Sequence, residues 1–195
     1  MTDRETYNKE LQRALSELPP EARRAFALDV AEQTVRLWSD KADRRTGTGD
    51  AMKLVRSRLD QAWQYLLGSG PAGEPPESTD LQAHVPDEDD EDWGIGQGLQ
   101  GNAVLAAIHA MRSLTGGSDV QQVMRVVRQA EEAAELVDGE QVEGYEFTPD
   151  VETELWEGEH AVTQRAAQTK ALDTLRRGVE SGEPLREVVA SLRAG

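Results

Sequence analysis

The spacing of apolar residues constrains this fold more than any other feature of the sequence, because it follows the period of an α-helix. Between residues 52 and 66, apolar side chains recur every three or four positions, which places them on one helical face. These side chains are Met52, Val55, Leu59, Trp63 and Leu66. No stretch alternates apolar and polar residues long enough to predict a strand. The pattern therefore predicts an all-α fold.

Other segments with helical spacing are bounded by proline or glycine. We expect helices ending near residue 18 and spanning about 21–42, 102–114, 120–137, 150–177 and 185–192. Short turns between consecutive helices favour antiparallel pairs. We therefore expect a single all-α domain over residues 1–195 with about six to seven helices. In it, two helix hairpins pack on the long helix 150–177.

The segment 68–101 contains Gly, Pro, Ser and acidic residues with few apolar anchors. This composition predicts a long exposed loop, with the acidic part, 68–96, partly disordered. Its end, Gly96-Gln-Gly98-Leu-Gln-Gly101, matches the dinucleotide-binding fingerprint, but that motif must follow a buried strand. Here the acidic run Asp87–Asp92 precedes it. We therefore interpret the glycines as a flexible turn before a helix that Asn102 caps.

The charge of the chain is strongly negative and unevenly distributed. The formal net charge is −16, with 37 acidic residues against 21 Lys and Arg. Residues 71–96 hold nine acidic residues and residues 131–159 hold twelve, and neither block contains a Lys or Arg. A field of this sign repels phosphates, so nucleic acid is excluded as a partner.

The absence of cysteine and the hydropathy of the chain indicate the cellular compartment of the protein. The chain has no cysteine, which excludes disulfides and thiolate sites and fits a reducing compartment. The first residues are polar, without the apolar core of a signal peptide, and no stretch approaches the ~20 apolar residues that cross a bilayer. We predict a cytoplasmic protein without membrane attachment.

The titratable residues form no catalytic pattern. Glu157 and His160 have the three-residue spacing of di-metal bundles, and Glu32 or Glu132 from neighbouring helices would complete such a set. This metal-dependent enzyme is an alternative hypothesis only, because no second motif of this spacing occurs. His109 lies beside an apolar helix face, where a half-buried, hydrogen-bonded histidine is the expected role. We predict no catalytic residue, no metal and no cofactor.

Three stretches carry a family resemblance. They are Leu59-Asp60-x-x-Trp63-x-x-Leu66 after a Gly49-Asp50 turn, Glu91-Asp92-Trp93-Gly94 ahead of the alanine-rich helix 103–114, and Leu155-Trp156-Glu157. Over about residues 20–178 the chain resembles the YjaG-like bacterial family, domain of unknown function 416. The resemblance implies a compact all-α fold in bacteria and carries no known reaction.

Clustering of acidic residues without Lys or Arg is typical of surfaces that recognise a basic protein, since complementary fields steer encounter. We therefore expect a non-catalytic binding protein, of the immunity or inhibitor type that neutralises a basic toxin or nuclease. The predicted contact residues are Asp87, Glu88, Asp89, Asp90, Glu91, Asp92, Trp93, Glu143, Tyr145, Phe147 and Trp156. The alternative is a helical protein without a dedicated site, whose acidity serves solubility. Self-association into a homo-oligomer is left open.

Overall fold

A computed structural model describes residues 3–41, 49–70, 74–87, 94–116, 119–140 and 149–194. Within these ranges the chain forms eight α-helices, one 3-10 helix and no strand. The elements are α1 (Arg4–Glu17), α2 (Pro20–Lys41), α3 (Gly49–Leu66), η1 (Thr79–His84), α4 (Ile95–Thr115), α5 (Val120–Gly139), α6 (Pro149–Trp156), α7 (Glu159–Glu180) and α8 (Leu185–Ala194). The predicted all-α class is confirmed.

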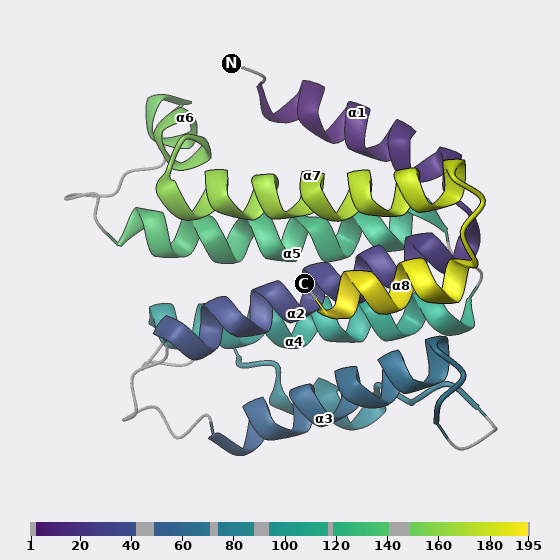
Figure 1. Ribbon diagram of the computed structural model, residues 1–195. Coiled ribbons are helices and arrows are strands. Elements are labelled where there is room, and N and C mark those ends of the chain that lie inside the picture. Colours follow the sequence, from purple (N-terminus) through teal and green to yellow (C-terminus); the bar gives the residue numbers. More distant parts are fainter. Residues whose placement is uncertain are drawn as a thin grey trace.

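Helix α2 is the centre of the fold (Figure 1) and contacts α3, α4, α5, α7 and α8. Its apolar side chains are too widely distributed around the axis to form a single stripe, which is typical of a helix enclosed by neighbours. Small alanines let those neighbours approach closely. The buried residues of α2 are Ala22, Ala25, Phe26, Ala27, Leu28, Val30, Ala31, Thr34, Val35 and Trp38.

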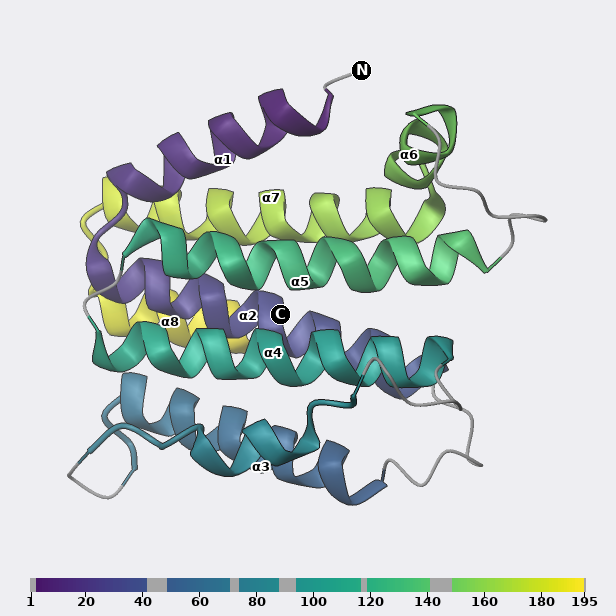
Figure 2. The same ribbon diagram turned by 180° about the vertical axis from the view of Figure 1, so that it is seen from behind.

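The two predicted hairpins are present, since α2 packs on α3 and α4 packs on α5. Seen from behind, α4 and α5 run side by side in front of α2 (Figure 2). Helix α7 covers α5 and α2, and α8 folds back onto α7 and α2. Helix α7 thus contacts one helix of each hairpin, as the sequence predicted, and α2 joins the two hairpins through its contacts with α4 and α5.

The segment predicted as an exposed loop contains an ordered anchor. In η1, Leu81 is fully buried and packs with the main core, and η1 contacts α3 and α4. Asp80 accepts two hydrogen bonds from Arg58 of α3, from Nε at 3.0 Å and from Nη2 at 2.6 Å. One apolar residue and one ion pair therefore hold residues 79–84 against the helices.

Helix α4 begins seven residues earlier than the predicted cap at Asn102, with Gly94 at its N-cap. The glycines at 96, 98 and 101 thus lie inside the helix, and the interpretation as a flexible turn was wrong. At Gly101 the helix lies close to Pro86, since a Cβ on this residue would be in ordinary van der Waals contact with Cδ of Pro86 at 3.6 Å. The segment after η1 therefore packs directly on α4.

The long helix predicted over 150–177 is interrupted at Gly158, which separates α6 from α7. Asp138 of α5 supplies the N-terminal cap of α7, because its two carboxylate oxygens accept from the backbone N–H groups of His160 at 3.1 Å and Ala161 at 2.9 Å. A Cβ at position 158 would overlap this carboxylate. A cap from another helix therefore explains both the break and the glycine.

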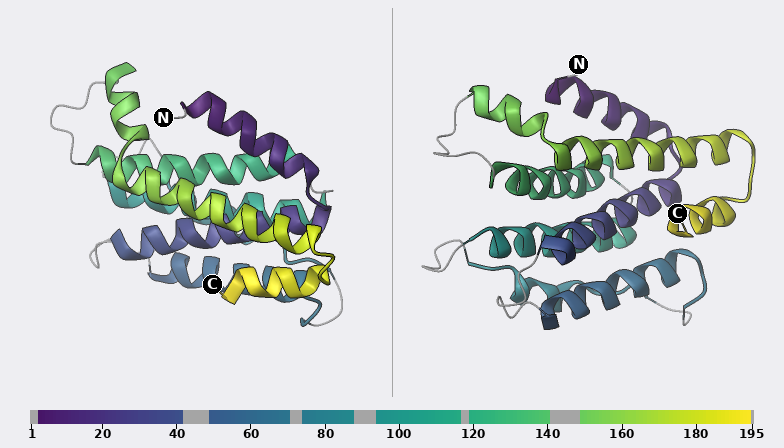
Figure 3. Two further views of the ribbon diagram at one scale, coloured as in Figure 1. Left: turned by 45° about the horizontal axis from the view of Figure 1, so that its top comes forward. Right: turned by 60° about the vertical axis from the view of Figure 1, so that its left-hand side comes forward.

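Helices α1 and α6 lie on the outer side of α5 and α7, and the N-terminal end of α1 lies beside α6 (Figure 3). Both pack on fewer neighbours than α2, since α1 contacts mainly α5 and α6 contacts α5 and α7. None of the described helices combines the length and the apolar character needed to cross a membrane.

Gly178→Ala is expected to destabilise the protein by about 1–3 kcal/mol, because the added methyl group would collide with the side chain of Val188 where α8 crosses α7. Gly49→Ala is the matched control, since a Cβ there meets no atom within 4 Å. Urea unfolding followed by circular dichroism measures both. A Gly178→Ala midpoint equal to that of Gly49→Ala would contradict the packing of α8.

Candidate functional site

A groove of about 490 Å³ opens between the start of α1 and α6. Its lining is dominated by acidic side chains, with Trp156 as the aromatic element. The lining residues are Asp3, Arg4, Glu5, Glu152, Thr153, Trp156 and Glu157. We call this the acidic groove.

The groove lies at the most acidic end of the described structure. Exposed carboxylates occur where α5 ends, α6 follows and α7 begins. They belong to Glu140, Asp150, Glu152, Glu154, Glu157 and Glu159. The sequence has no Lys or Arg between Arg128 and Arg165. The Lys and Arg side chains near this end therefore belong to other segments of the chain.

Arg4 of α1 is the positively charged residue that lines the groove. It pairs with Glu135 of α5, and its Nη1 lies 3.4 Å from Oε1 of Glu152 in α6. One guanidinium thus joins three helices. The lining holds four carboxylates, those of Asp3, Glu5, Glu152 and Glu157, and one arginine. Glu5 is paired with Lys9 of α1, and the groove still keeps a negative excess.

Trp156 forms the wall of the groove, and intramolecular contacts cover most of its ring. The Arg165 guanidinium stacks 3.6 Å from the ring centroid, and Arg4 lies 5.2 Å away. Tyr7 makes an edge-on contact with a centroid distance of 5.8 Å. Trp156 is therefore only 7% exposed, and it shapes the groove more than it projects from it.

A buried polar network beneath α1 positions these residues. Glu131 of α5 is 7% exposed, and burial raises its pKa to about 6, against the opposing effect of the Arg4 and Arg165 charges. Tyr7 donates a hydrogen bond from its hydroxyl to Oε1 of Gln168 at 2.9 Å. Burial and the charge of Glu131 raise the pKa of Tyr7 to about 12. The orientation of α1 on α5 and α7 thus depends on polar contacts.

The predicted contact residues are placed unevenly. Asp87 is exposed at the end of the segment that follows η1, and Trp156 lies in the acidic groove. Glu88, Asp89, Asp90, Glu91, Asp92, Trp93, Glu143, Tyr145 and Phe147 lie outside the described residues. Two acidic residues near the N-terminus, Asp3 and Glu5, belong to the groove and were missed, because only the packing of α1 brings them beside α6.

The hypothetical metal set is not assembled in the described structure. His160 is engaged by Asp138, whose Oδ1 lies 2.7 Å from its Nδ1, and Glu132 pairs with Arg128 at 2.8 Å. Among the described residues, no group of three or more His, Asp and Glu side chains is placed to hold a metal ion.

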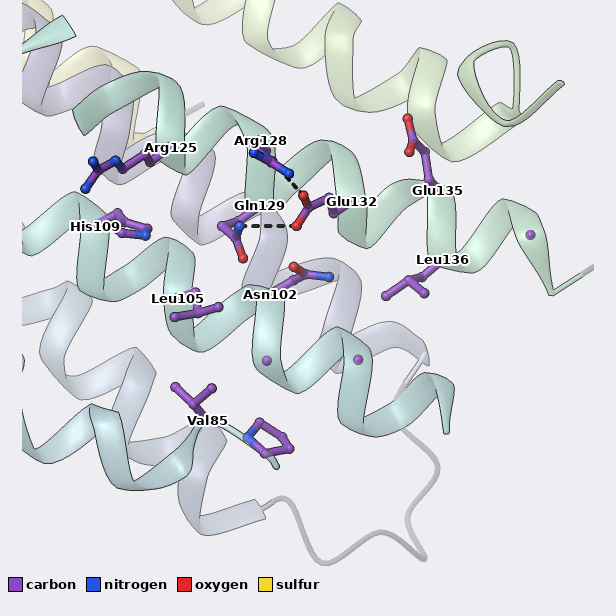
Figure 4. Close-up of a pocket in the computed structure, with 14 residues that line it drawn as sticks. Val85, Asn102, Leu105, His109, Arg125, Arg128, Gln129, Glu132, Glu135 and Leu136 are labelled. Atoms are coloured by element: carbon purple, nitrogen blue, oxygen red, sulfur yellow. Dashed lines mark hydrogen bonds and ion pairs between the residues drawn. The ribbon is translucent and has the colours of Figure 1, made fainter. Parts of the chain in front are cut away.

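A second and larger concavity, of about 760 Å³, lies between α4, α5 and the segment at residues 85–86 (Figure 4). His109 points into it from α4, and burial together with the charges of Arg112 and Arg125 lowers its pKa. Gln122 lies 2.9 Å from Nδ1 of His109. The expected half-buried, hydrogen-bonded histidine is confirmed.

Fold and site together define an all-α domain with an acidic groove and without a described metal cluster. No family model matches the sequence, and no curated protein does. The structure resembles the crystal structure of a DUF416 (domain of unknown function 416) family protein from Shewanella baltica OS155. The TM-score is 0.71 at 14% identity, over 94% of this chain and 91% of the other. The predicted resemblance to this family is therefore confirmed at the level of the fold.

Glu131→Gln tests the buried network through the pH dependence of stability. The folded protein raises the pKa of this carboxyl from 4.5 to about 6, so its ionisation opposes folding as the pH rises through this interval. At pH 7.5 we expect the variant to be more stable than the wild type by up to about 2 kcal/mol. At pH 4 the difference should nearly vanish.

Urea unfolding at both pH values measures this effect, with Glu180→Gln on the exposed end of α7 as the control that should show little change. A Glu131→Gln variant less stable than the wild type at pH 7.5 would contradict the prediction. It would mean that attraction to Arg4 and Arg165 outweighs the cost of burying the charge.

Proposed function

We propose that this chain is a non-catalytic binding protein that recognises a basic protein through its acidic groove and the carboxylates around it. The observation that carries the proposal is the groove lining, in which four carboxylates accompany one arginine beside Trp156. Lys and Arg side chains of a partner form charge-assisted hydrogen bonds with such carboxylates. We further propose a role of the immunity or inhibitor type, in which the partner is a cationic toxin or nuclease.

The charge arrangement favours rapid and selective encounter. Glu154 and Glu157 are exposed and form no ion pair with the other described residues, so their charge is available to a partner. A surface of one sign raises association rates and rejects partners of like charge. The cysteine-free composition supports a cytoplasmic site of action.

The groove also lies between two helices that pack on few neighbours, α1 and α6. Such elements can adjust when a partner binds, because few contacts with other helices hold them. The polar network around Arg4 would then set their spacing in the free protein. This arrangement supports a recognition surface that adapts to its partner within a rigid core.

A comparison of two charge-reversed variants tests the proposal. Glu154→Lys/Glu157→Lys reverses two charges at the acidic end. Glu77→Lys/Glu180→Lys reverses two exposed charges elsewhere, so both variants have the same net charge. The wild type and both variants are each immobilised on a resin and incubated with lysate of the source organism. The resin is washed at low and then at high salt, and the released proteins are identified by mass spectrometry.

We expect a basic protein that salt releases from the wild type and from Glu77→Lys/Glu180→Lys. Its affinity for Glu154→Lys/Glu157→Lys, measured with the purified partner, should be weaker by about tenfold or more. Equal affinity of the two variants would show that the acidity acts only through net charge or solubility, and the proposal would fail. Recovery of no basic protein would also contradict it.

A further inference from the structure

The groove between α4 and α5 has a polar end and an apolar end, and its chemistry differs from that of the acidic groove. Figure 4 shows His109 and Leu105 of α4 facing α5, with Arg125 and Arg128 on the opposite wall. The volume of about 760 Å³ lies within the range of small-molecule sites.

Gln122 determines which nitrogen of His109 can donate into the groove. The Gln122 side-chain nitrogen lies 3.2 Å from the backbone oxygen of His109 and 2.9 Å from its Nδ1. A carbonyl oxygen can only accept, so the atom between them is the amide NH₂, and Nδ1 must accept as well. The proton of the neutral ring therefore lies on Nε2, which is a donor.

The uncompensated charge in this groove is positive, although the whole chain is strongly acidic. Arg128 and Gln129 both donate to Glu132, and Glu135 is paired with Arg4. Arg125 is exposed and forms no ion pair with another described residue. Its one hydrogen bond, to Oε1 of Gln122, is long at 3.5 Å. Among the described residues, neither the guanidinium of Arg125 nor the Nε2–H of His109 is held by a carboxylate, and both residues line the groove.

The other part of the groove is lined by apolar side chains from three elements, namely Val85, Pro86, Leu105 and Leu136. Leu136 is 37% exposed on a helix whose outer face is otherwise polar. It lies eleven residues after Arg125 on α5, which corresponds to about 16 Å along the helix axis. An apolar chain of about ten carbons would span most of this distance.

We propose that the groove between α4 and α5 binds a small amphipathic anion, with its carboxylate or phosphate monoester held by Arg125 and His109 and its apolar chain lying along Leu105 and Leu136. Arginine presents a fork of donors that suits either headgroup. The site is independent of the acidic groove, so each proposal stands or fails alone.

Isothermal titration calorimetry with the full chain tests this site, with each probe below its micelle concentration. Decanoate and decyl phosphate distinguish the two headgroups, and decyltrimethylammonium carries the same chain on a cation. Arg125→Gln removes the charged donor, and Leu136→Gln shortens the apolar wall. Arg112→Gln is the matched control, because Arg112 is exposed close to His109 and does not line the groove.

We expect saturable one-to-one binding of at least one anionic probe, and at least tenfold weaker binding of the cation. Arg125→Gln should weaken the preferred anion by about tenfold and Leu136→Gln by about fivefold, whereas Arg112→Gln should change little. The proposal is overturned if neither anion binds, if the cation binds equally well, or if Arg112→Gln weakens binding as much as Arg125→Gln.

Discussion

The packing of five helices around α2 is the constraint on which the rest of this structure depends. The large side chains of α2, Phe26, Leu28 and Trp38, are fully enclosed, and helices from both halves of the sequence supply the enclosure. Apolar burial is worth about 25 cal/mol per Å², so a helix enclosed by five neighbours concentrates the stabilising area of the chain. The other helices can then expose one face each, and two of those faces form the grooves.

The helices whose bounds were predicted correctly are those in which the apolar pattern of one short segment defines the helix. The stripe from Met52 to Leu66 identifies α3 because one helix face carries the whole pattern. The start of α4 was misplaced, because three glycines in six residues suggest a turn, although all three lie within the helix. The break at Gly158 was missed because its cause, the Asp138 carboxylate, lies on another helix. Contacts of this kind depend on tertiary packing, which periodicity does not report.

The candidate site likewise combines a feature that the sequence shows with features that only tertiary packing creates. The concentration of acidic residues in 131–159 is visible in the sequence and becomes the acidic end of the fold. The contribution of Asp3 and Glu5 was not predictable, since it arises from the way Arg4 and Tyr7 attach α1 to the other helices. Trp156 was predicted as a partner contact from its acidic surroundings, yet Arg165 covers its ring.

A core of α2, α4 and α5 carries two more loosely attached helices, α1 and α6, which frame the acidic groove. Native-state hydrogen exchange across a denaturant series measures this hierarchy directly. Amides in the middle of α2 should exchange only through global unfolding, whereas those of α1 and α6 should exchange through smaller openings at lower free energy. Exchange of α1 and α6 at the same free energy as α2 would contradict the account.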